Sequence, residues 1–130
     1  MILAVVPARS FAAAKQRLAE AVPAEVRAAL ARAMLEDVLA ALAAAGLDGV
    51  IVVTEDAEVA RLAEARGARV IREDESAGHT AAVARGVAAC LAAGATGMLT
   101  VPGDVPGLTA EEVRAVVAAC PPPPAAVFVP

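Results

Sequence analysis

Three cationic side chains follow the first apolar run of the chain. Arg9, Lys15 and Arg17 lie within residues 7–18, and no acidic residue comes before Glu20. Lys15 is the single lysine among the 11 lysine and arginine residues. Guanidinium and ammonium groups form charge-assisted hydrogen bonds with phosphate oxygens, so this segment suits a polyphosphate. The alternative interpretation is a solvated basic turn without a ligand.

One carboxylate stands in a turn framed by proline and glycine. Asp104 lies within residues 102–107 and is the only acidic residue between Glu75 and Glu111. Magnesium bound to nucleotide phosphates is held in proteins through one or two carboxylates, so Asp104 suits such an ion. The alternative is an aspartate that only favours the turn.

A third segment, residues 72–80, combines backbone freedom with a predicted helix start. Gly78 lets the backbone approach a ligand closely, because it has no side chain. His79 and Thr80 begin a predicted helix, whose free N–H groups suit a base edge or a phosphate. The alternative is a surface histidine without a role. The acidic residues 73–75 are expected to form a solvated face.

Short apolar runs precede these three segments and predict strands, and the run at residues 2–6 is typical of a strand buried on both faces. Helical periodicity fills the intervals, where Asp56 is a typical N-cap and Thr109 forms a capping box with Glu112. The predicted strands are residues 2–6, 50–54, 68–71, 98–101 and 126–129. The predicted helices are residues 24–45, 56–67, 80–93 and 109–120.

The alternation of strands and helices predicts an α/β fold. We expect a single domain of residues 1–130, with a Rossmann-like, mostly parallel sheet and helices on both faces. Ligands of such sheets bind beyond the carboxyl ends of the strands, so the three segments should share one edge. The first and fourth strands are expected to be neighbours. The first helix is expected to bury one stripe, made of Val26, Leu30, Met34, Val38 and Leu42.

The composition excludes several classes of protein. A net charge of −4 disfavours nucleic-acid binding, which needs a basic face, and an aromatic content of 2% leaves no platform for stacked bases. A charged content of 20% and a mean hydropathy of +0.67 exclude intrinsic disorder. Glycines and a proline interrupt the longest uncharged stretch, residues 86–103, so no transmembrane helix is expected.

The expected location is the cytoplasm, with neither a membrane nor a nucleic acid as partner. No basic region precedes the first apolar run, so no secretory signal is expected in residues 1–6. Cys90 and Cys120 lie in helical patterns and are interpreted as buried thiols of a reducing compartment. The sequence lacks a Walker loop, a dinucleotide-binding glycine motif, a serine nucleophile elbow and a His/Cys cluster with metal-binding spacing.

The N-terminal motif resembles the signature of 2-phospho-L-lactate guanylyltransferases, which act in biosynthesis of a deazaflavin redox coenzyme. Residues 6–18 read VPARSFAAAKQRL, and residues 31–39, 78–83 and 100–109 are also similar to that family. The resemblance covers essentially the whole chain. It implies the fold of the nucleotide-diphospho-sugar transferases, a superfamily that includes the molybdopterin nucleotidyltransferases.

The resemblance also implies a reaction. GMP would pass from GTP to a small phosphorylated carboxylic acid of the 2-phospho-L-lactate, phosphoenolpyruvate or 3-phosphoglycerate type, with release of pyrophosphate. The implied catalytic residues are Lys15, Arg17 and Asp104, with magnesium as the cofactor on Asp104. The implied nucleotide-binding residues are Pro7, Ala8, Arg9, Gly78, His79, Thr80 and Gly103.

Two departures from the family pattern leave alternatives open. Arg9 stands where many members have lysine. Members are also longer, and carry a second acidic metal ligand after the fifth strand, so the chain is expected to be C-terminally incomplete. Pairing of the apolar strand at residues 126–129 as a homodimer is expected.

Three alternatives remain beside the guanylyltransferase. The first is a molybdopterin nucleotidyltransferase of the same fold. The second is a nucleotide-sugar glycosyltransferase, although residues 104–106 lack the second aspartate of an Asp-x-Asp motif. The third is a non-catalytic nucleotide-binding or interaction domain.

Overall fold

A central parallel sheet organises the protein. The computed structural model describes residues 1–13, 20–75 and 78–129. Within these residues the strands are β1 (Ile2–Pro7), β2 (Gly49–Thr54), β3 (Arg69–Arg72) and β4 (Gly97–Thr100). The helices are α1 (Ala24–Ala44), α2 (Ala57–Ala65), α3 (His79–Ala92) and α4 (Ala110–Ala119).

The sheet confirms the predicted α/β fold. Its order is β3-β2-β1-β4, and each neighbouring pair is parallel. Val5 of β1 is in register with Ile51 of β2 and with Thr100 of β4. The first and fourth strands are therefore neighbours, as predicted, and all four strands end at one edge of the sheet.

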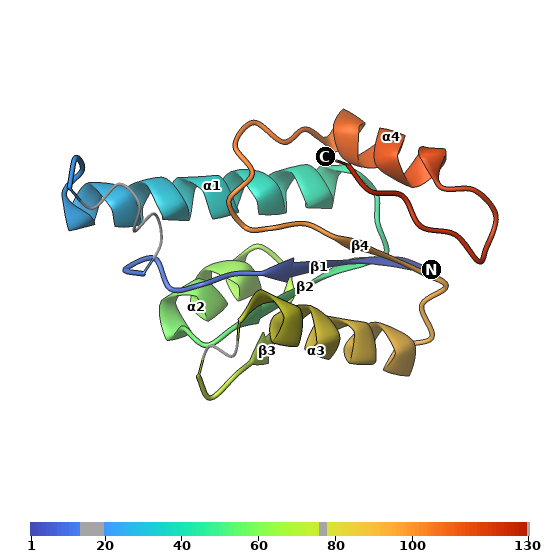
Figure 1. The fold of residues 1–130 in the computed structure, drawn as a ribbon, viewed down its shortest axis with the longest axis horizontal. Helices are drawn as coiled ribbons and strands as arrows, with labels where there is room; N and C mark the ends of the chain where they lie inside the picture. Colours follow the sequence, from blue (N-terminus) through green and yellow to red (C-terminus); the bar gives the residue numbers. More distant parts are fainter. Residues whose placement is uncertain (14–19, 76–77, 130) are drawn as a thin grey trace.

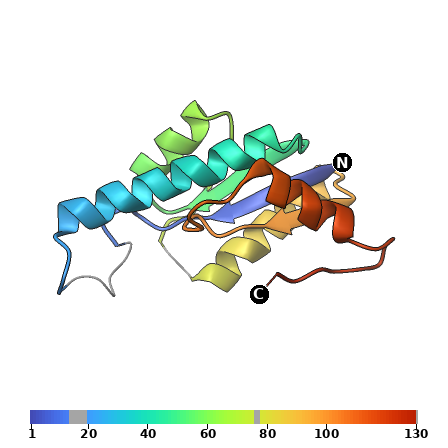
Figure 2. The same ribbon diagram turned by 90° about the horizontal axis from the view of Figure 1, so that it is seen from above.

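Helices cover both faces of the sheet, as Figures 1 and 2 show. Helices α1, α2 and α4 pack on one face, where Ala4 and Val6 of β1 join the larger core cluster. Helix α3 packs on the opposite face against Leu3 and Val5. Because successive side chains of β1 enter two different cores, its apolar run has no polar alternation.

A glycine allows the close contact between α3 and β1. Gly86 lies in α3, and a Cβ atom added there would overlap the side chain of Val5. Helix α3 therefore rests with its backbone directly on the central strand. No bulkier residue fits at this position without a shift of the helix or of Val5.

The predicted N-caps of two helices are present. The Asp56 carboxylate accepts a hydrogen bond from the Val59 N–H at 3.0 Å, at the start of α2. The Thr109 hydroxyl accepts one from the Glu112 N–H at 3.1 Å, at the start of α4. Each cap satisfies one of the N–H groups that the first turn of a helix leaves without a partner.

The prediction of a fifth strand is wrong. Residues 126–129 are irregular, and Phe128 is 91% exposed. The apolar pattern alone makes no strand, because a strand also needs a neighbour for its backbone hydrogen bonds. No pairing of these residues with the sheet occurs in the described part of the chain. The expected homodimer rested on this strand.

The apolar stripe of α1 is buried only in part. Met34, Val38 and Leu42 are buried, whereas Val26 and Leu30 are exposed. The 21 residues of α1 extend about 30 Å, whereas the six of β1 extend about 20 Å. The first turns of α1 therefore project past the end of the sheet (Figure 1), where no strand lies beneath them.

The two cysteines differ in environment. Cys90 is buried in the α3 face of the core, where burial raises the pKa of its thiol against the opposing effect of Arg69. Its thiol therefore stays protonated at neutral pH. Cys120 is exposed at the end of α4, so the prediction of a buried thiol is wrong there. Cys120 is the C-cap of α4, where the backbone leaves the helix with φ of −72° and ψ of 122°, so its side chain lies beyond the end of the packed helix.

Across residues 1–13, 20–75 and 78–129, none of the helices combines the length and the apolar stretch that a membrane span needs.

Replacing Gly86 by Ala should destabilise the protein. The added methyl group overlaps Val5, and overpacking of this kind costs about 1–3 kcal/mol. Helix propensity alone would instead stabilise the variant by about 1 kcal/mol. Urea unfolding separates the two outcomes by sign. The double variant Gly86→Ala/Val5→Ala, compared with Val5→Ala alone, tests the cause, because it removes the two Cγ atoms that overlap the added methyl group. A Gly86→Ala protein more stable than the wild type would contradict the packing described here.

Candidate nucleotide site

A cavity of about 610 Å³ opens where the strands of the sheet end. This volume lies within the usual range for small-molecule sites. The cavity is bounded by the segments after β1, β2, β3 and β4 and by one side of α1 and α3. Its lining residues are Pro7, Ala8, Arg9, Phe11, Ala31, Leu35, Val53, Glu55, Glu73, Gly78, His79, Ala82, Pro102, Gly103 and Asp104.

Residues predicted from three distant parts of the sequence meet in this cavity. They are Pro7, Ala8, Arg9, Gly78, His79, Gly103 and Asp104. Thr80 is not among the lining residues. Lys15 and Arg17 lie outside the described residues, so their place in the site stays a prediction.

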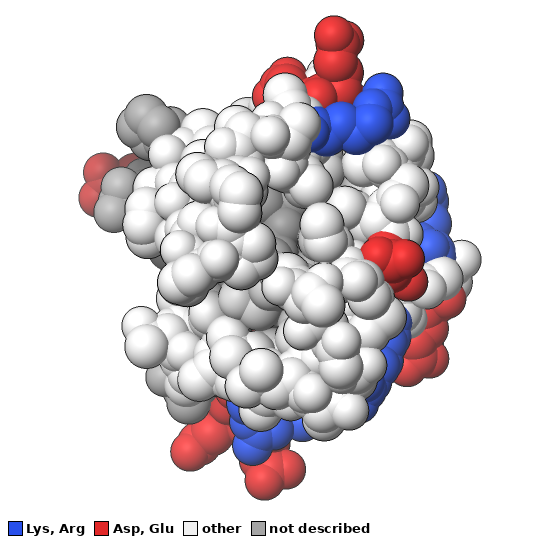
Figure 3. Space-filling model, turned by 90° about the vertical axis from the view of Figure 1, so that its right-hand side faces the viewer, with Lys and Arg blue, Asp and Glu red and all other residues white. Residues whose placement is uncertain are grey.

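The opposite end of the sheet is different in character. Figure 3 shows the side at which the strands begin, where the centre of the face is uncharged and the charged side chains gather around its rim. The described residues of those segments that line the cavity, such as Arg9, His79 and Asp104, lie at the other end of the sheet.

Hydrogen bonds from β2 and its following turn hold the segment after β1. The Ala8 N–H donates to the Val53 carbonyl oxygen at 3.0 Å. The Ser10 N–H donates to Glu55 Oε1 at 3.2 Å, and the Ser10 Oγ accepts from the Ala13 N–H at 3.1 Å. This backbone is thus tied to the sheet, which places Arg9 at the cavity.

Phe11 anchors the same segment in the core. Its ring is buried and lines the cavity. The guanidinium of Arg32, on α1, lies 6.0 Å from the ring centroid, within the range of a cation–π contact. One face of the ring therefore meets a charged group whose own position is fixed by other contacts.

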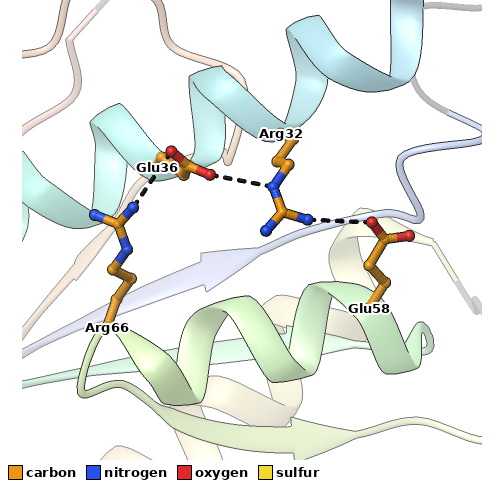
Figure 4. A network of polar contacts seen from close by, with 4 residues as sticks. All are labelled: Arg32, Glu36, Glu58 and Arg66. Atoms are coloured by element: carbon orange, nitrogen blue, oxygen red, sulfur yellow. Dashed lines mark hydrogen bonds and ion pairs between the residues drawn. The ribbon is translucent and has the colours of Figure 1, made fainter. Parts of the chain in front are cut away.

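A network of four charged residues fixes Arg32 (Figure 4). Its Nε lies 3.2 Å from Glu36 Oε1, and its Nη1 lies 3.2 Å from Glu58 Oε1. Arg66 Nη2 lies 3.3 Å from Glu36 Oε2. The alternating charges join α1 to both ends of α2. Through Arg32, this network also contacts Phe11 and so the segment after β1.

The turn after β4 packs directly on the segment after β1. The Val101 N–H donates to the Val5 carbonyl oxygen at 3.0 Å, which extends the contact of the two strands. A Cβ atom at Gly103 would lie 3.4 Å from the Cβ of Ala8. Asp104 follows immediately and is exposed. The acidic turn and the cationic segment are therefore neighbours.

The start of α3 forms another wall. Gly78 is the N-cap with φ of 95°, a left-handed conformation that glycine adopts without strain. Its carbonyl oxygen accepts from the Ala82 N–H at 3.1 Å, and no side chain caps the helix. N–H groups of the first turn therefore remain for solvent or a ligand, beside the exposed His79.

Sequence analysis missed two acidic residues of the cavity. Residues 73–75 were expected to form a solvated face, but Glu73 is buried, with 6% of its side chain exposed. Its N–H donates to the Thr54 carbonyl oxygen at 3.0 Å, which continues the pairing of β2 and β3 one residue past the end of β3. Asp74 and Glu75 are exposed as expected. Glu55 lines the cavity from the turn after β2. The available signal was position, since Glu55 directly follows β2 and Glu73 directly follows β3.

The described lining carries more negative than positive charge. Glu55, Glu73 and Asp104 are acidic, and Arg9 is the one arginine among these lining residues. Within the described residues no three His, Cys, Asp or Glu side chains cluster to hold a metal. Asp104 alone still fits magnesium, since this ion commonly takes one carboxylate and fills its remaining positions with phosphate and water oxygens.

Comparison of the sequence and the structure with those of known proteins identifies relatives of the chain. A family model described as a MobA-like NTP transferase domain matches residues 24–130. A nucleotidyl transferase from Methanothermobacter thermautotroptrophicus has a similar structure, with a TM-score of 0.68 and 26% identity over 92% of this chain and 57% of that one. None of the curated proteins compared with the chain matches it.

Two further structures share the fold. One, from Desulfovibrio desulfuricans G20, is described as a nucleotide-diphospho-sugar transferase, with a TM-score of 0.73 and 17% identity over 90% of this chain and 53% of that one. The other is a CMP:2-keto-3-deoxy-manno-octonic acid synthetase complexed with CTP, with a TM-score of 0.62 and 21% identity over 90% and 46%. The chain thus spans about half the length of its structural relatives and has the predicted nucleotide-diphospho-sugar transferase-like fold.

Replacing Arg32 by Met should lower the free energy of unfolding by about 1 kcal/mol. The variant loses two exposed ion pairs and the contact with Phe11, each of which contributes a fraction of that amount. The difference from wild type should shrink in 1 M salt, because charges are screened over about 3 Å there. Urea unfolding at low and high salt measures both effects. Arg61→Met, on the exposed side of α2, is the matched control. Equal losses in the two variants would show that the network contributes nothing.

Proposed function

Because the chain belongs to the family of MobA-like NTP transferase domains, we propose that it takes part in transfer of GMP from GTP to a small phosphorylated carboxylic acid, with release of pyrophosphate. The observation that carries this proposal is the single cavity at the carboxyl ends of the strands. It gathers Arg9, Gly78, His79 and Asp104, which come from three separate segments. Acceptors of the 2-phospho-L-lactate, phosphoenolpyruvate or 3-phosphoglycerate type fit the resemblance of the N-terminal motif.

The proposed reaction needs little covalent help from the protein. A phosphate oxygen of the acceptor attacks the α-phosphorus of GTP, a new P–O bond forms, and the bond to the β-phosphate bridging oxygen breaks to release pyrophosphate. The attacking oxygen is already anionic, so no strong base is required. Catalysis then consists of alignment and neutralisation of charge.

Each proposed side chain has a part in that neutralisation. Arg9 binds phosphate oxygens from the segment that β2 and Glu55 hold in place. Lys15 and Arg17, outside the described residues, are proposed to bind the same polyphosphate. Asp104 is proposed to hold magnesium, which when bound stabilises negative charge on the phosphates.

Glu73 supports guanine as the base. An ionised carboxylate only accepts hydrogen bonds. Guanine presents two adjacent N–H donors, N1–H and the 2-amino group. At the same two positions adenine has an unprotonated N1 and a C2–H, neither of which is an N–H donor. Glu73 is buried in the cavity wall near the start of α3, so its oxygens suit that edge of guanine.

Binding without catalysis is a second candidate because, within the described residues, no three His, Cys, Asp or Glu side chains cluster to hold a metal ion. Asp104 is the one metal ligand that the sequence analysis selected. The chain also spans about half the length of its structural relatives. Binding of nucleotide without turnover is therefore the second candidate.

Nucleotide binding with magnesium present is the first experiment. Calorimetry with GTP, ATP, CTP and UTP should show a preference for GTP. Lys15→Ala should weaken GTP binding roughly 10- to 150-fold, since a hydrogen bond to a charged group contributes about 1.5–3 kcal/mol. Arg61→Ala, which also removes one positive charge, should leave the affinity unchanged. Equal affinity for all four nucleotides would contradict the proposed function.

Pyrophosphate release then separates the two candidate functions. The chain is incubated with GTP, magnesium and each of the three acceptor acids. Release that depends on an acceptor and falls in Asp104→Asn supports the transferase. GTP binding without any release supports the binding domain instead.

A further inference from the structure

Two arginines outside the cavity hold the wall in which Glu73 lies. Arg85 Nε, on α3, is 3.9 Å from Glu73 Oε2. Arg85 Nη1 donates to the Arg72 carbonyl oxygen at 3.4 Å, and Arg72 Nη2 donates to the Glu55 carbonyl oxygen at 3.1 Å. The ends of β2 and β3 and the body of α3 are linked through these contacts.

The two partners of the ion pair differ in exposure. The Glu73 side chain is 6% exposed, whereas that of Arg85 is 53% exposed. A carboxylate removed from water needs a compensating charge or hydrogen bonds. Arg85 is the one cation within ion-pair distance of Glu73 among the described residues. Glu73 thus lies between Arg85, which faces its Oε2, and the cavity, which it helps to line.

The backbone position of Arg85 suits it to compensate the charge of the Glu73 carboxylate. It lies in α3, the helix that Gly86 brings into direct contact with β1. A guanidinium is planar and donates in fixed directions, so its bond to the Arg72 carbonyl oxygen also limits the orientation of its Nε. At 3.9 Å the contact between Arg85 Nε and Glu73 Oε2 is an ion pair rather than a hydrogen bond, so the guanidinium acts by charge and favours orientations of the carboxylate in which Oε2 faces it.

We propose that Arg85 is a positioning residue that orients the Glu73 carboxylate and thereby sets the preference for a base with two adjacent N–H donors over a base with one. The inference rests on the proposed function, in which Glu73 accepts hydrogen bonds from guanine. Arg85 does not touch the nucleotide. Arg85 acts only by orienting Glu73. Its replacement is therefore expected to change the preference among bases and not the binding of the phosphates.

Comparison of GTP with ITP tests this proposal. Hypoxanthine keeps the N1–H of guanine but lacks the 2-amino group, so the ratio of the two affinities measures the second hydrogen bond. The wild type should prefer GTP by roughly tenfold or more, the factor expected for a hydrogen bond to a charged group. Arg85→Met should lower that ratio several-fold, and Glu73→Gln should bring it near one.

The double variant Glu73→Gln/Arg85→Met distinguishes positioning from a general structural role. If Arg85 acts through Glu73, its removal changes the ratio no further once Glu73 is replaced. Arg85→Lys keeps the charge and should recover part of the preference, and it also covers the case that Arg85→Met does not fold. Arg61→Met is the matched control for loss of an exposed positive charge.

The outcomes separate the two proposals. An equal loss of GTP and ITP affinity in Arg85→Met, with the ratio unchanged, would overturn the positioning role and leave the proposed function intact. A wild-type ratio near one, or no change in Glu73→Gln, would instead refute guanine recognition by Glu73. Reduced preference in both single variants without an additive effect in the double variant is the result expected.

Discussion

The enclosure of β1 is the constraint on which the rest of the structure depends. β2 and β4 pair with its two edges, and its side chains are buried in two different cores. A slip of one residue would exchange those two sets of side chains, so the register is strongly specified. Because all neighbours run parallel, the chain leaves every strand at the same edge. The cavity at that edge is a consequence of this arrangement.

The lining residues belong to loops, but regular elements determine where those loops lie. Glu55 accepts a hydrogen bond from the Ser10 N–H, and Arg32 of α1 makes a cation–π contact with the Phe11 ring. Gly86 lets α3 lie close to β1, which brings Gly78 to the cavity. Charged side chains at the surface thus support an interior site through rigid helices, even though each exposed ion pair is weak by itself.

Local signals in the sequence predicted most elements, because they are properties of neighbouring residues. The N-caps at Asp56 and Thr109 and the apolar run of β1 need no knowledge of the fold. Glu73 is instead buried in a contact with Arg85 of the later helix α3, which no local pattern marks, so three consecutive acidic residues suggested only a solvated face. Val26 is likewise exposed because α1 is longer than the strands of the sheet, which its local sequence does not show. The roles of Lys15 and Arg17 stay predictions.

The excess of acidic groups in the cavity has a thermodynamic consequence. With Glu55, Glu73 and Asp104 opposed by Arg9, the described lining is unfavourable for a polyphosphate that arrives without cations. Under the proposed function, nucleotide and divalent cation therefore promote each other's binding. Linkage makes that promotion reciprocal, so the factor by which the cation raises nucleotide affinity equals the factor by which nucleotide raises cation affinity. The free chain would then retain little metal, and the concentration of the metal–nucleotide complex would control occupancy of the site.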